Sequence, residues 1–518
     1  MGMRGSKDVL YLGIDAGTQS IKASVYDGAM QLVEERAVKF DEELPQYGTR
    51  AGMIVEDEAA GVVRSPVFMW VEALEIALER LAQAVDMSSI VAVSGSAQQH
   101  SSVWWRAFPA SFDPNERLVE QLRAQKAFST ELSPIWADSS TSEEVKSAEG
   151  RVGGAAAMQQ LTGSVGTERF TGNQIARMAK RHPEIYKDTE RVMLLSTALT
   201  SLFLGRPAAT EAGDAAGMNM MQLDKNVWLD DLEDVFDAPG LADKAGDLCE
   251  ANANLGAVSD FMVKRFGFSP SCQVAAFTGD NLATLVGCVD RANDVIVSLG
   301  TSDTVLSQQP TRKQVNQAAL VFPHPTDQAL YMIMICYKNG GAVRNDEKGE
   351  DHKWSEVDEI LLADADENEP DVICIFFPHK EIAPRPMDAC ERAFRIDNGE
   401  EVDVASLSWR QRVRGVILAR ALSIKTHLED CKSSYDRVVI TGGGSNSKGI
   451  PAVFRQVLGV PVFTSQQADG ASRGAALKAM LAVDKAPKGH AILSERPEAA
   501  SFAQVPATDL YRKIEAQL

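Results

Sequence analysis

Two short turns, each formed by a glycine and a threonine, could bind the phosphate groups of a ligand. They are Gly17-Thr18 and Gly300-Thr301, and each follows an apolar, β-rich run and precedes a second strand-like run. This pattern is typical of a hairpin with a tight turn. Glycine lets a backbone approach an anion closely, and threonine or serine hydroxyls add hydrogen-bond donors. Two such turns in the same order predict a duplicated domain that grips a polyphosphate between its halves.

The other common phosphate-binding sequence does not occur in the chain. There is no G-x-x-x-x-G-K-[ST] loop, which excludes a Walker-type site as far as a sequence can exclude it. Transfer of a phosphoryl group depends on positioning and charge neutralisation rather than on a nucleophilic triad. Glycines, hydroxyls and acids are therefore the residue types that such a reaction requires.

Composition limits the classes of partner. The chain has 518 residues and a net charge of −20. A negative surface disfavours nucleic acids and anionic membranes, whereas a nucleotide can still be held by backbone amides and one or two cations. Seven scattered cysteines without a CxxC pair indicate neither a disulfide framework nor a zinc site. We expect a cytoplasmic protein, because no apolar run is long enough to cross a bilayer and no signal-peptide core is present.

The elements that would position the two turns repeat in the two halves of the chain. The first half has three β-rich runs over residues 9–38 and helical spacing that begins at Ser65, a good N-cap, with Pro66 first in the helix. A strand at 90–93 then leads into a turn at 94–100. The second half has strands at 273–277, 294–299, 304–308 and 331–336, a helix at about 405–429, and a strand at 437–440 before a glycine turn.

This order predicts an α/β protein with two domains, each a mixed sheet flanked by helices, and a ligand-binding cleft between them. The length also exceeds that of a single hydrophobic core. Gly267 and Pro270 interrupt the regular pattern, so we expect domains at 1–268 and 269–518. The charged stretches 345–353 and 363–370 are interpreted as a mobile surface loop and a solvated loop.

Six segments occur in one order along the chain: 98–100 (QQH), 136–140 (WADSS), 167–174 (TERFTGNQ), 277–281 (FTGDN), 298–304 (SLGTSDT) and 441–444 (TGGG). Together they resemble the FGGY family of sugar kinases, part of the larger actin-like group of ATPases. The likeness runs over nearly the whole chain. It implies two actin-like (ribonuclease H-like) ATPase domains, the first for the sugar and the second for the nucleotide.

The resemblance implies roles for residues of a sugar pocket. Asp280 would be the general base that accepts the proton of a sugar hydroxyl, which is worth about 10²–10⁴-fold in rate. The residues alone also allow a simple Asp-Asn turn after a strand. Asp138 would be a pocket carboxylate or the N-cap of the next helix, and Arg169 a sugar contact or half of an ion pair at a helix start. The expected sugar-binding residues are Gln99, His100, Asp138, Arg169, Asp280 and Asn281.

The resemblance also implies a site for Mg-ATP. Asp15 would help to hold Mg²⁺ through water. Lys22 would add charge or be a solvated strand lysine, and Trp354 would contact the nucleotide or belong to a satellite core. The small residues from Gly470 to Ala476 would let adenine approach or serve close helix packing. The expected nucleotide-binding residues are Gly17, Thr18, Gln19, Ser20, Lys22, Gly300, Thr301, Ser302, Trp354, Gly442, Gly443 and Asn446.

The resemblance implies an ATP-dependent kinase for the terminal hydroxyl of a ketopentose, with D-xylulose phosphorylated at O5 as the expected reaction. A kinase for another ketose or polyol with the same fold is the alternative. A non-catalytic actin-like sensor of sugar or nucleotide is a third interpretation, although such a protein would be expected to lose Asp280 or a phosphate turn. The expected partners are a small sugar and ATP, with neither nucleic acid nor membrane, and a homodimer is left open.

Overall fold

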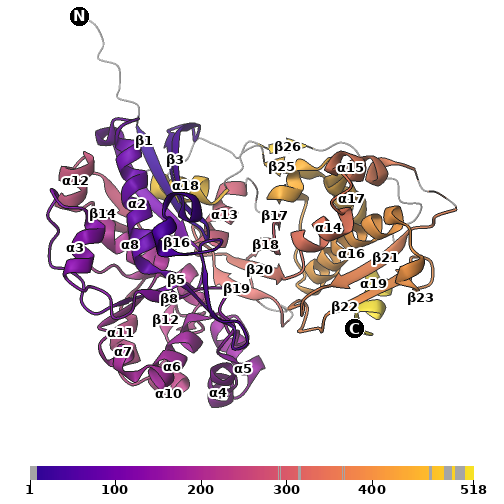
Figure 1. The fold of residues 1–518 in the computed structure, drawn as a ribbon, viewed down its shortest axis with the longest axis horizontal. Helices are drawn as coiled ribbons and strands as arrows, with labels where there is room; N and C mark the ends of the chain where they lie inside the picture. Colours follow the sequence, from indigo (N-terminus) through magenta and orange to yellow (C-terminus); the bar gives the residue numbers. More distant parts are fainter. Residues whose placement is uncertain are drawn as a thin grey trace, which may run out of the picture. The chain divides into compact units, whose positions relative to one another are not determined.

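The chain divides into two compact units (Figure 1). The computed structural model describes residues 9–289, 291, 293–312, 317–364, 366, 368–465, 470–483, 493–495 and 508–518. Unit 1 comprises Met1–Gly287, Phe322–Ala329 and Asp469–His490, and unit 2 comprises Cys288–Val321, Leu330–Ala468 and Ala491–Leu518. The main boundary therefore lies after Gly287 and not after residue 268, because the strand that follows residue 268 pairs with a strand of unit 1 and residues 280–287 also belong to that unit.

Unit 1 is built on one mixed sheet. Strands β1 (Leu10–Ala16), β2 (Ser20–Asp27) and β3 (Leu32–Lys39) are antiparallel neighbours, and β6 (Ile90–Ala97) runs parallel to β1. The far edge is formed by β15 (Gln273–Ala275) and β14 (Asn254–Ala257), in the order β14-β15-β6-β1-β2-β3, and β16 (Thr278–Gly279) also pairs with β6. The expected strand 273–277 thus belongs to the first sheet and not to the second half of the fold.

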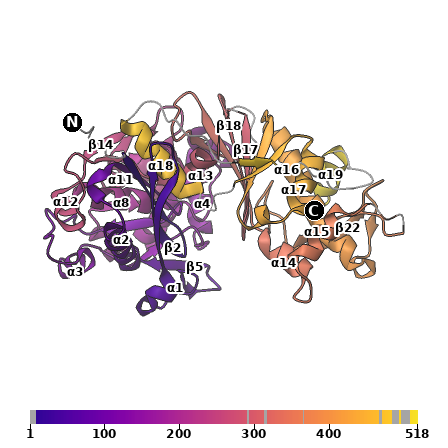
Figure 2. The ribbon, with the colours of Figure 1, turned by 90° about the horizontal axis from the view of Figure 1, so that it is seen from above.

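Helices cover both faces of this sheet because its central strand alternates between two cores. Leu12 and Ile14 share one core with α2 (Val67–Ala82) and α8 (Leu195–Leu204). Tyr11 lies in a second core with α18 (Gly470–Val483), which packs on β1 and β6. Figure 2 shows α18, coloured yellow, among the indigo and magenta elements of unit 1, so a segment from near the end of the chain completes the first unit.

Unit 2 repeats the same strand relationships. Strands β17 (Asp294–Leu299) and β18 (Asp303–Gln309) form a hairpin, and β24 (Arg437–Thr441) runs parallel to β17 as β6 does to β1. The sheet order is β19-β20-β18-β17-β24-β25-β26, with β19 (Leu320–Pro323), β20 (Tyr331–Tyr337), β25 (Val462–Ser465) and β26 (Leu493–Glu495). The mixed sheets with flanking helices confirm the predicted fold class.

The helices of unit 2 include α14 (Gly341–Lys348), α15 (Trp354–Leu362), α16 (Trp409–Asp430), α17 (Gly449–Leu458) and α19 (Thr508–Glu515). A small second sheet, β21 (Val372–Phe377), β22 (Cys390–Arg395) and β23 (Glu401–Val402), packs on α16 through β21. A one-turn 3-10 helix, η4 (Gly443–Asn446), follows β24, and η3 is Val404–Ser406. The long predicted helix is α16, with its start four residues later than expected because Ser408 caps it.

The remaining elements of unit 1 surround its sheet and carry the loops of the site. They are α1 (Phe40–Glu43), η1 (Pro45–Tyr47), β4 (Ile54–Asp57), β5 (Val62–Pro66), η2 (Met87–Ser89), β7 (Ser102–Trp105), α3 (Leu118–Ala124), β8 (Leu132–Pro134), α4 (Ser142–Val152), α5 (Ala155–Thr162), α6 (Thr171–Arg181), α7 (Pro183–Lys187), β9 (Arg191–Leu194), β10 (Thr210–Glu211), α9 (Ala212–Ala216), β11 (Met221–Gln222), β12 (Val227–Trp228), α10 (Leu232–Phe236), α11 (Leu241–Ala245), β13 (Leu248–Cys249), α12 (Asp260–Phe266) and α13 (Asp280–Cys288).

Three local predictions differ from the structure. Ser65 and Pro66 end β5 instead of starting α2, since the Ser65 hydroxyl donates to the Gly52 carbonyl at 2.7 Å and does not cap a helix. Strand β6 continues through Ala97, where a turn was expected, because residues 94–97 pair with β1. The charged stretch 345–353 is not wholly a loop, because its first four residues complete α14.

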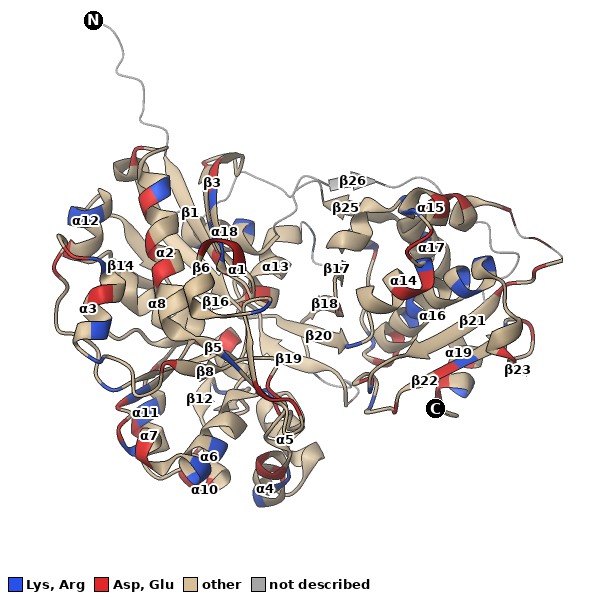
Figure 3. Ribbon diagram, in the orientation of Figure 1, with Lys and Arg blue, Asp and Glu red and all other residues tan. Residues whose placement is uncertain are grey.

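Some surface helices carry charges of both signs. Figure 3 shows acidic and basic residues side by side on α4 and α14, so the net charge of −20 is not concentrated in these helices. In the part of the chain that the structure describes, we find no helix with the length and apolar character that a membrane span requires.

Candidate active site

The first glycine-threonine turn connects β1 and β2 and is held by the loops around it. The Gly17 amide donates to the Ser20 carbonyl at 3.0 Å, and the Thr18 hydroxyl accepts from the Trp136 indole at 2.9 Å. Asp15, at the end of β1, accepts from the Ser96 hydroxyl on β6 at 2.7 Å. This turn therefore has the hairpin form that the sequence predicts. The Trp136 contact was not predicted.

Asp15 and Lys22 are direct partners in the β1–β2 ladder. Antiparallel partners project their side chains from the same face of a sheet, so a carboxylate and an ammonium group lie together beside the turn. Gln19 is exposed, and its carbonyl accepts from the Phe40 amide at 2.9 Å.

His100 lies in a buried loop directly after β6. Its backbone has a φ of 66°, in the left-handed region that few residues other than glycine adopt. Nδ1 lies 2.8 Å from the Gly217 carbonyl, and since a carbonyl only accepts, Nδ1 carries the proton and Nε2 is an acceptor. Burial, together with the positive charge of Arg169, lowers the pKa of His100 to about 3, so the ring is neutral at pH 7.

Asp280 is the first residue of α13 and lies in a chain of hydrogen bonds. Its Oδ1 accepts from the Asn281 amide at 2.8 Å and from the Asn281 side chain at 3.1 Å. The same side-chain nitrogen donates to Gln99 Oε1 at 3.0 Å. Burial raises the pKa of Asp280 to about 6, although hydrogen bonds from the amides of Asn281 and Gln99 oppose the rise. The structure thus brings Gln99, Asn281 and Asp280 together, as predicted for one site.

A buried acid, Asp214, lies next to these residues and was not predicted. Its Oδ2 accepts from the Ser196 hydroxyl at 2.6 Å. Burial raises the pKa of Asp214 to about 8, and the charges of Glu211 and Asp280 add to the rise. Gln99 and Asp214 both lie against Gly279, because a Cβ atom added at that glycine would lie 2.5 Å from Gln99 Cγ and 2.8 Å from Asp214 Oδ1. The sequence signal that could have indicated Asp214 is its position as the single acid within the small-residue run 212–217.

Asp138 organises a loop, and its two oxygens are already occupied. Oδ2 accepts from the Val63 amide at 3.0 Å, and Oδ1 accepts from the Ser140 amide and hydroxyl and from the Gln174 side chain at 2.9, 2.6 and 2.8 Å. These four donors leave the carboxylate little capacity for a sugar hydroxyl. It is not the cap of the next helix either, because Thr141 occupies the N-cap position of α4.

Arg169 is half-buried, and its charge acts on His100. Among the described residues, its Nε atom is buried without a hydrogen-bond partner. The Gln99 Nε2 atom and the Asp214 Oδ1 atom are also buried without a hydrogen-bond partner among the described residues. Buried polar groups are normally paired, so a cluster of unpaired ones indicates a place for water or a polar ligand.

In unit 2, two glycine turns meet at the end of β17. The Gly300 amide lies 3.3 Å from the Ser302 carbonyl across the second glycine-threonine turn. Gly442 has a φ of 75°, and an added Cβ atom there would lie 2.7 Å from the Leu299 carbonyl. Glycine is required at this position for both reasons. The turn from Gly442 into η4 therefore lies directly beside the residue that precedes Gly300.

Trp354 and Asn446 belong to α15 and η4, and hydrogen bonds connect α15 to the segment that follows η4. Trp354 is the first residue of α15 and is 36% exposed, and Asn446 ends η4 and is exposed. Further along α15, Asp358 Oδ1 accepts from the Lys448 and Gly449 amides at 3.0 and 2.9 Å. Helix α15 is thus fixed to the segment that follows η4, which agrees with a role in one site.

Comparison with known proteins identifies the family. Over 490 residues the chain is 36% identical to xylulose kinase 2 of Arabidopsis thaliana, an alignment that covers 91% of this chain and 87% of the relative. It is 36% identical to the xylulose kinase of Rattus norvegicus over 480 residues, an alignment that covers 90% of this chain and 87% of that relative. Family models for the N- and C-terminal domains of FGGY carbohydrate kinases match residues 126–287 and 295–483. The chain belongs to the FGGY family of carbohydrate kinases.

The fold of this kinase agrees with the assignment. A crystal structure of a xylulose kinase from Rhodospirillum rubrum has a TM-score of 0.78 at 17% identity and covers 98% of both chains. The N-terminal family model ends at residue 287, where the main part of unit 1 also ends. The C-terminal model extends to residue 483 and so includes α18, which packs in unit 1.

Helix α18 shows what the small residues near the end of the chain do in this kinase. A Cβ atom added at Gly474 would lie 1.8 Å from the Ala283 carbonyl oxygen of α13. The same addition at Gly287 would lie 2.0 Å from the Gly470 carbonyl oxygen. The small residues therefore serve close packing of α18 on α13 within unit 1, which supports the packing interpretation over an approach of adenine.

Proposed function

We propose that this carbohydrate kinase transfers the terminal phosphoryl group of ATP to O5 of D-xylulose, giving D-xylulose 5-phosphate and ADP. The observation that carries the proposal is the alignment over about nine-tenths of the chain with curated xylulose kinases of a plant and a mammal. The group of Gln99, Asn281 and Asp280 beside a neutral His100 supports a site for a polyhydroxylated substrate.

In this proposal Asp280 is the general base. The sugar O–H bond breaks as its oxygen bonds to the terminal phosphorus of ATP, the proton passes to the Asp280 carboxylate, and the bond from phosphorus to ADP breaks. A base is most useful when its pKa lies near the working pH, because it must be ionised and yet accept a proton. The raised pKa of about 6 meets both conditions at pH 7.

The sugar would be oriented by groups of both hydrogen-bonding kinds. His100 Nε2 accepts from a hydroxyl, since Nδ1 is engaged by the Gly217 carbonyl. Arg169 donates through its guanidinium group, and Asn281 accepts through its amide oxygen, because both hydrogens of its amide nitrogen are directed to Gln99 and Asp280. Asp138 shapes the loop and does not touch the sugar in this scheme, because its oxygens already accept four hydrogen bonds.

The phosphates of ATP are assigned to the Gly300–Ser302 turn, and the nucleoside to Gly442, Gly443, Asn446 and Trp354. Two findings support this grouping: the close approach of Gly442 to Leu299, and the bonds from Asp358 that join α15 to the segment after η4. In unit 1, Gly17, Thr18, Gln19, Ser20 and Lys22 are assigned to the phosphoryl group in transfer.

Asp15 fits a magnesium ion that is held largely through water. Mg²⁺ in kinases retains several waters and binds one or two carboxylates together with substrate phosphates. Asp15 is half-buried, beside the phosphate turn, and among the described residues no cluster of three or more His, Cys, Asp or Glu side chains could hold a metal. A bound Mg²⁺ would neutralise phosphate charge.

The raised pKa of Asp280 predicts the pH dependence of the reaction. Protonation removes the base, so kcat/KM for the sugar at saturating Mg-ATP should rise with pH through about 6 and level off above it. Measurement of initial rates of ADP release from pH 5 to 8 checks this, with doubled coupling enzyme as a control at each pH. A rate that stays constant down to pH 5 would show that Asp280 is not a base with this pKa.

A panel of acceptors tests the substrate. ADP release is measured with D-xylulose, L-xylulose, D-ribulose, L-ribulose, glycerol and xylitol, and the phosphorylated position is determined by ³¹P NMR. We expect the highest kcat/KM for D-xylulose and phosphate on O5. A higher value for another acceptor would assign the kinase to that sugar or polyol, and ADP release with none of them would favour a sensor.

A further inference from the structure

Helix α14 holds the backbone of the Gly300–Ser302 turn from one side. The Gly341 amide donates to the Gly300 carbonyl at 2.8 Å and to the Thr301 carbonyl at 3.0 Å. The Arg344 guanidinium also donates to the Gly300 carbonyl, at 3.2 Å. Two successive carbonyls of the turn therefore point toward α14.

The direction of these carbonyls fixes the direction of two amides. In a trans peptide the C=O and the following N–H point in opposite directions, because the six atoms of the unit are planar. The N–H groups of Thr301 and Ser302 consequently face away from α14. Successive backbone N–H groups directed to one side are a common anion-binding arrangement.

Arg344 is itself fixed by a buried carboxylate at the end of the turn. Its NH1 and NH2 groups donate to the two oxygens of Asp303 at 2.7 and 2.8 Å, and the Asp303 side chain has no exposed surface. This geometry is specific to arginine, because a lysine ammonium group cannot form these bonds to both Asp303 oxygens and to the Gly300 carbonyl at the same time.

Two further charges complete a buried group of four. Arg420 lies 3.2 Å from Asp303 and 3.4 Å from Glu381. Glu381 in turn accepts from the Lys338 and Ile382 amides at 2.7 and 2.8 Å. The two guanidinium groups balance the two carboxylates, so the network is neutral, and loss of one member would leave a buried charge unpaired.

Approach of α14 to the turn requires glycine at the helix start. A Cβ atom added at Gly341 would lie 2.4 Å from the Gly300 carbonyl oxygen, and one at Gly340 would lie 2.8 Å from the Thr301 carbonyl oxygen. Any larger residue would push the turn away from Arg344.

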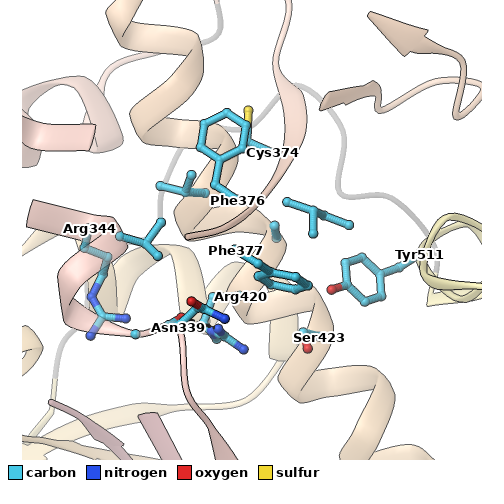
Figure 4. A pocket seen from close by; sticks show the side chains of 13 residues that line it. Asn339, Arg344, Cys374, Phe376, Phe377, Arg420, Ser423 and Tyr511 are labelled. Carbon is cyan, nitrogen blue, oxygen red and sulfur yellow. Dashed lines mark hydrogen bonds between the residues drawn. The ribbon is translucent and has the colours of Figure 1, made fainter. Parts of the chain in front are cut away.

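The cavity next to this network is too small for a nucleotide. Figure 4 shows the side chains that line it, with Arg344, Asn339 and Arg420 on one side and Phe377 and Tyr511 on the other. Its volume is about 30 Å³, which is room for one or two water molecules. The two guanidinium groups therefore serve the protein and not a ligand bound in this cavity.

We propose that Arg344 is a positioning residue for the phosphates of ATP. It holds the Gly300 carbonyl and the Asp303 carboxylate, and so keeps the amides of Thr301 and Ser302 directed toward the bound phosphates. The inference rests on the proposed function, which assigns this turn to ATP. Arg344 does not contact the nucleotide in this scheme.

A matched pair of substitutions tests this role. Arg344→Lys keeps the charge but loses the bond to either Gly300 or Asp303. Arg412→Lys is the control, because Arg412 makes the same two-bonded pair with Glu347 at the other end of α14, at 2.8 and 2.9 Å. Affinity for ATP without sugar is measured by titration calorimetry, KM for ATP and for D-xylulose by ADP release, and Tm by circular dichroism.

We expect Arg344→Lys to raise the Kd and the KM for ATP about tenfold, with the KM for the sugar unchanged. Arg412→Lys should leave all three constants within about twofold of the wild type. Equal ATP affinity in Arg344→Lys and wild type, or an equal loss in both variants, would overturn the inference. A wild-type protein that neither binds nor consumes ATP would instead overturn the proposed function.

If Arg344→Lys does not fold, the double variant Arg344→Met/Asp303→Asn provides the test. It removes one positive and one negative charge together, so the rest of the network stays neutral. We expect it to fold and to bind ATP at least about tenfold more weakly than the wild type. Wild-type affinity in a folded double variant would show that neither residue positions the turn.

Discussion

Replacement of Asp280 by asparagine is expected to lower kcat by about 10²–10⁴-fold, with ATP affinity nearly unchanged. Asparagine has the same shape and can still accept the bond from the Asn281 amide, but it cannot accept the sugar proton at neutral pH. Burial already disfavours the charged form of Asp280, so the neutral variant should be at least as stable as the wild type. Steady-state rates and calorimetry with ATP measure the two effects.

The control is Asp260→Asn at the start of α12 in the same unit. Asp260 is exposed and forms a surface ion pair with Lys264 at 3.3 Å, so its loss should change kcat less than twofold. A kcat within about fivefold of the wild type in Asp280→Asn would remove this carboxylate as the base. A parallel loss of ATP affinity would indicate that the variant has changed the fold and not only the chemistry.

Replacement of Gly474 by alanine is expected to destabilise unit 1 and to reduce activity. The added methyl group would lie 1.8 Å from the Ala283 carbonyl oxygen and 2.9 Å from the Gly287 amide nitrogen, and both are backbone atoms. Only separation of α18 from α13 relieves the contact, at a cost of about 1–3 kcal/mol or more. Since Asp280 begins α13, the shift should also lower kcat. We expect Tm to fall by roughly 5 °C.

Gly150→Ala is the matched control, since Gly150 lies inside α4 of the same unit with no atom within 4 Å of an added Cβ. Alanine is favoured over glycine in a helix by about 0.5–1 kcal/mol, so this variant should be equally or more stable. The packing argument fails if thermal unfolding gives the two variants the same Tm.

Much of the fold was predictable because its signals are local. The hairpins around Gly17 and Gly300 join neighbouring strands, so apolar runs and a glycine turn are enough to indicate them. Errors arose where distant residues override local preference. Ser65 looks like a helix cap, but its hydroxyl bonds to the Gly52 carbonyl in a strand.

The residue types of the candidate site were predictable, but the contacts that each side chain makes were not. Asp280, Asn281 and Gln99 do lie together, whereas Asp138 has its acceptors filled by Val63, Ser140 and Gln174, which its sequence neighbours alone could not reveal. Asp214 and Arg344 were missed because an isolated acid and a helical arginine usually belong to solvated surfaces. Only their burial against Ser196 and Asp303 distinguishes them.

The two hairpins with their glycine turns, and the acid that follows the strand at Val274, are predictable from the residue pattern alone. These depend on bonds and dihedral angles between near neighbours. Two other features become evident only in the folded chain: α18 completes unit 1, and Gln99 contacts Asn281, 182 residues away. Contacts of this kind depend on which surfaces exclude water together, and that is a property of the packed chain and not of any segment.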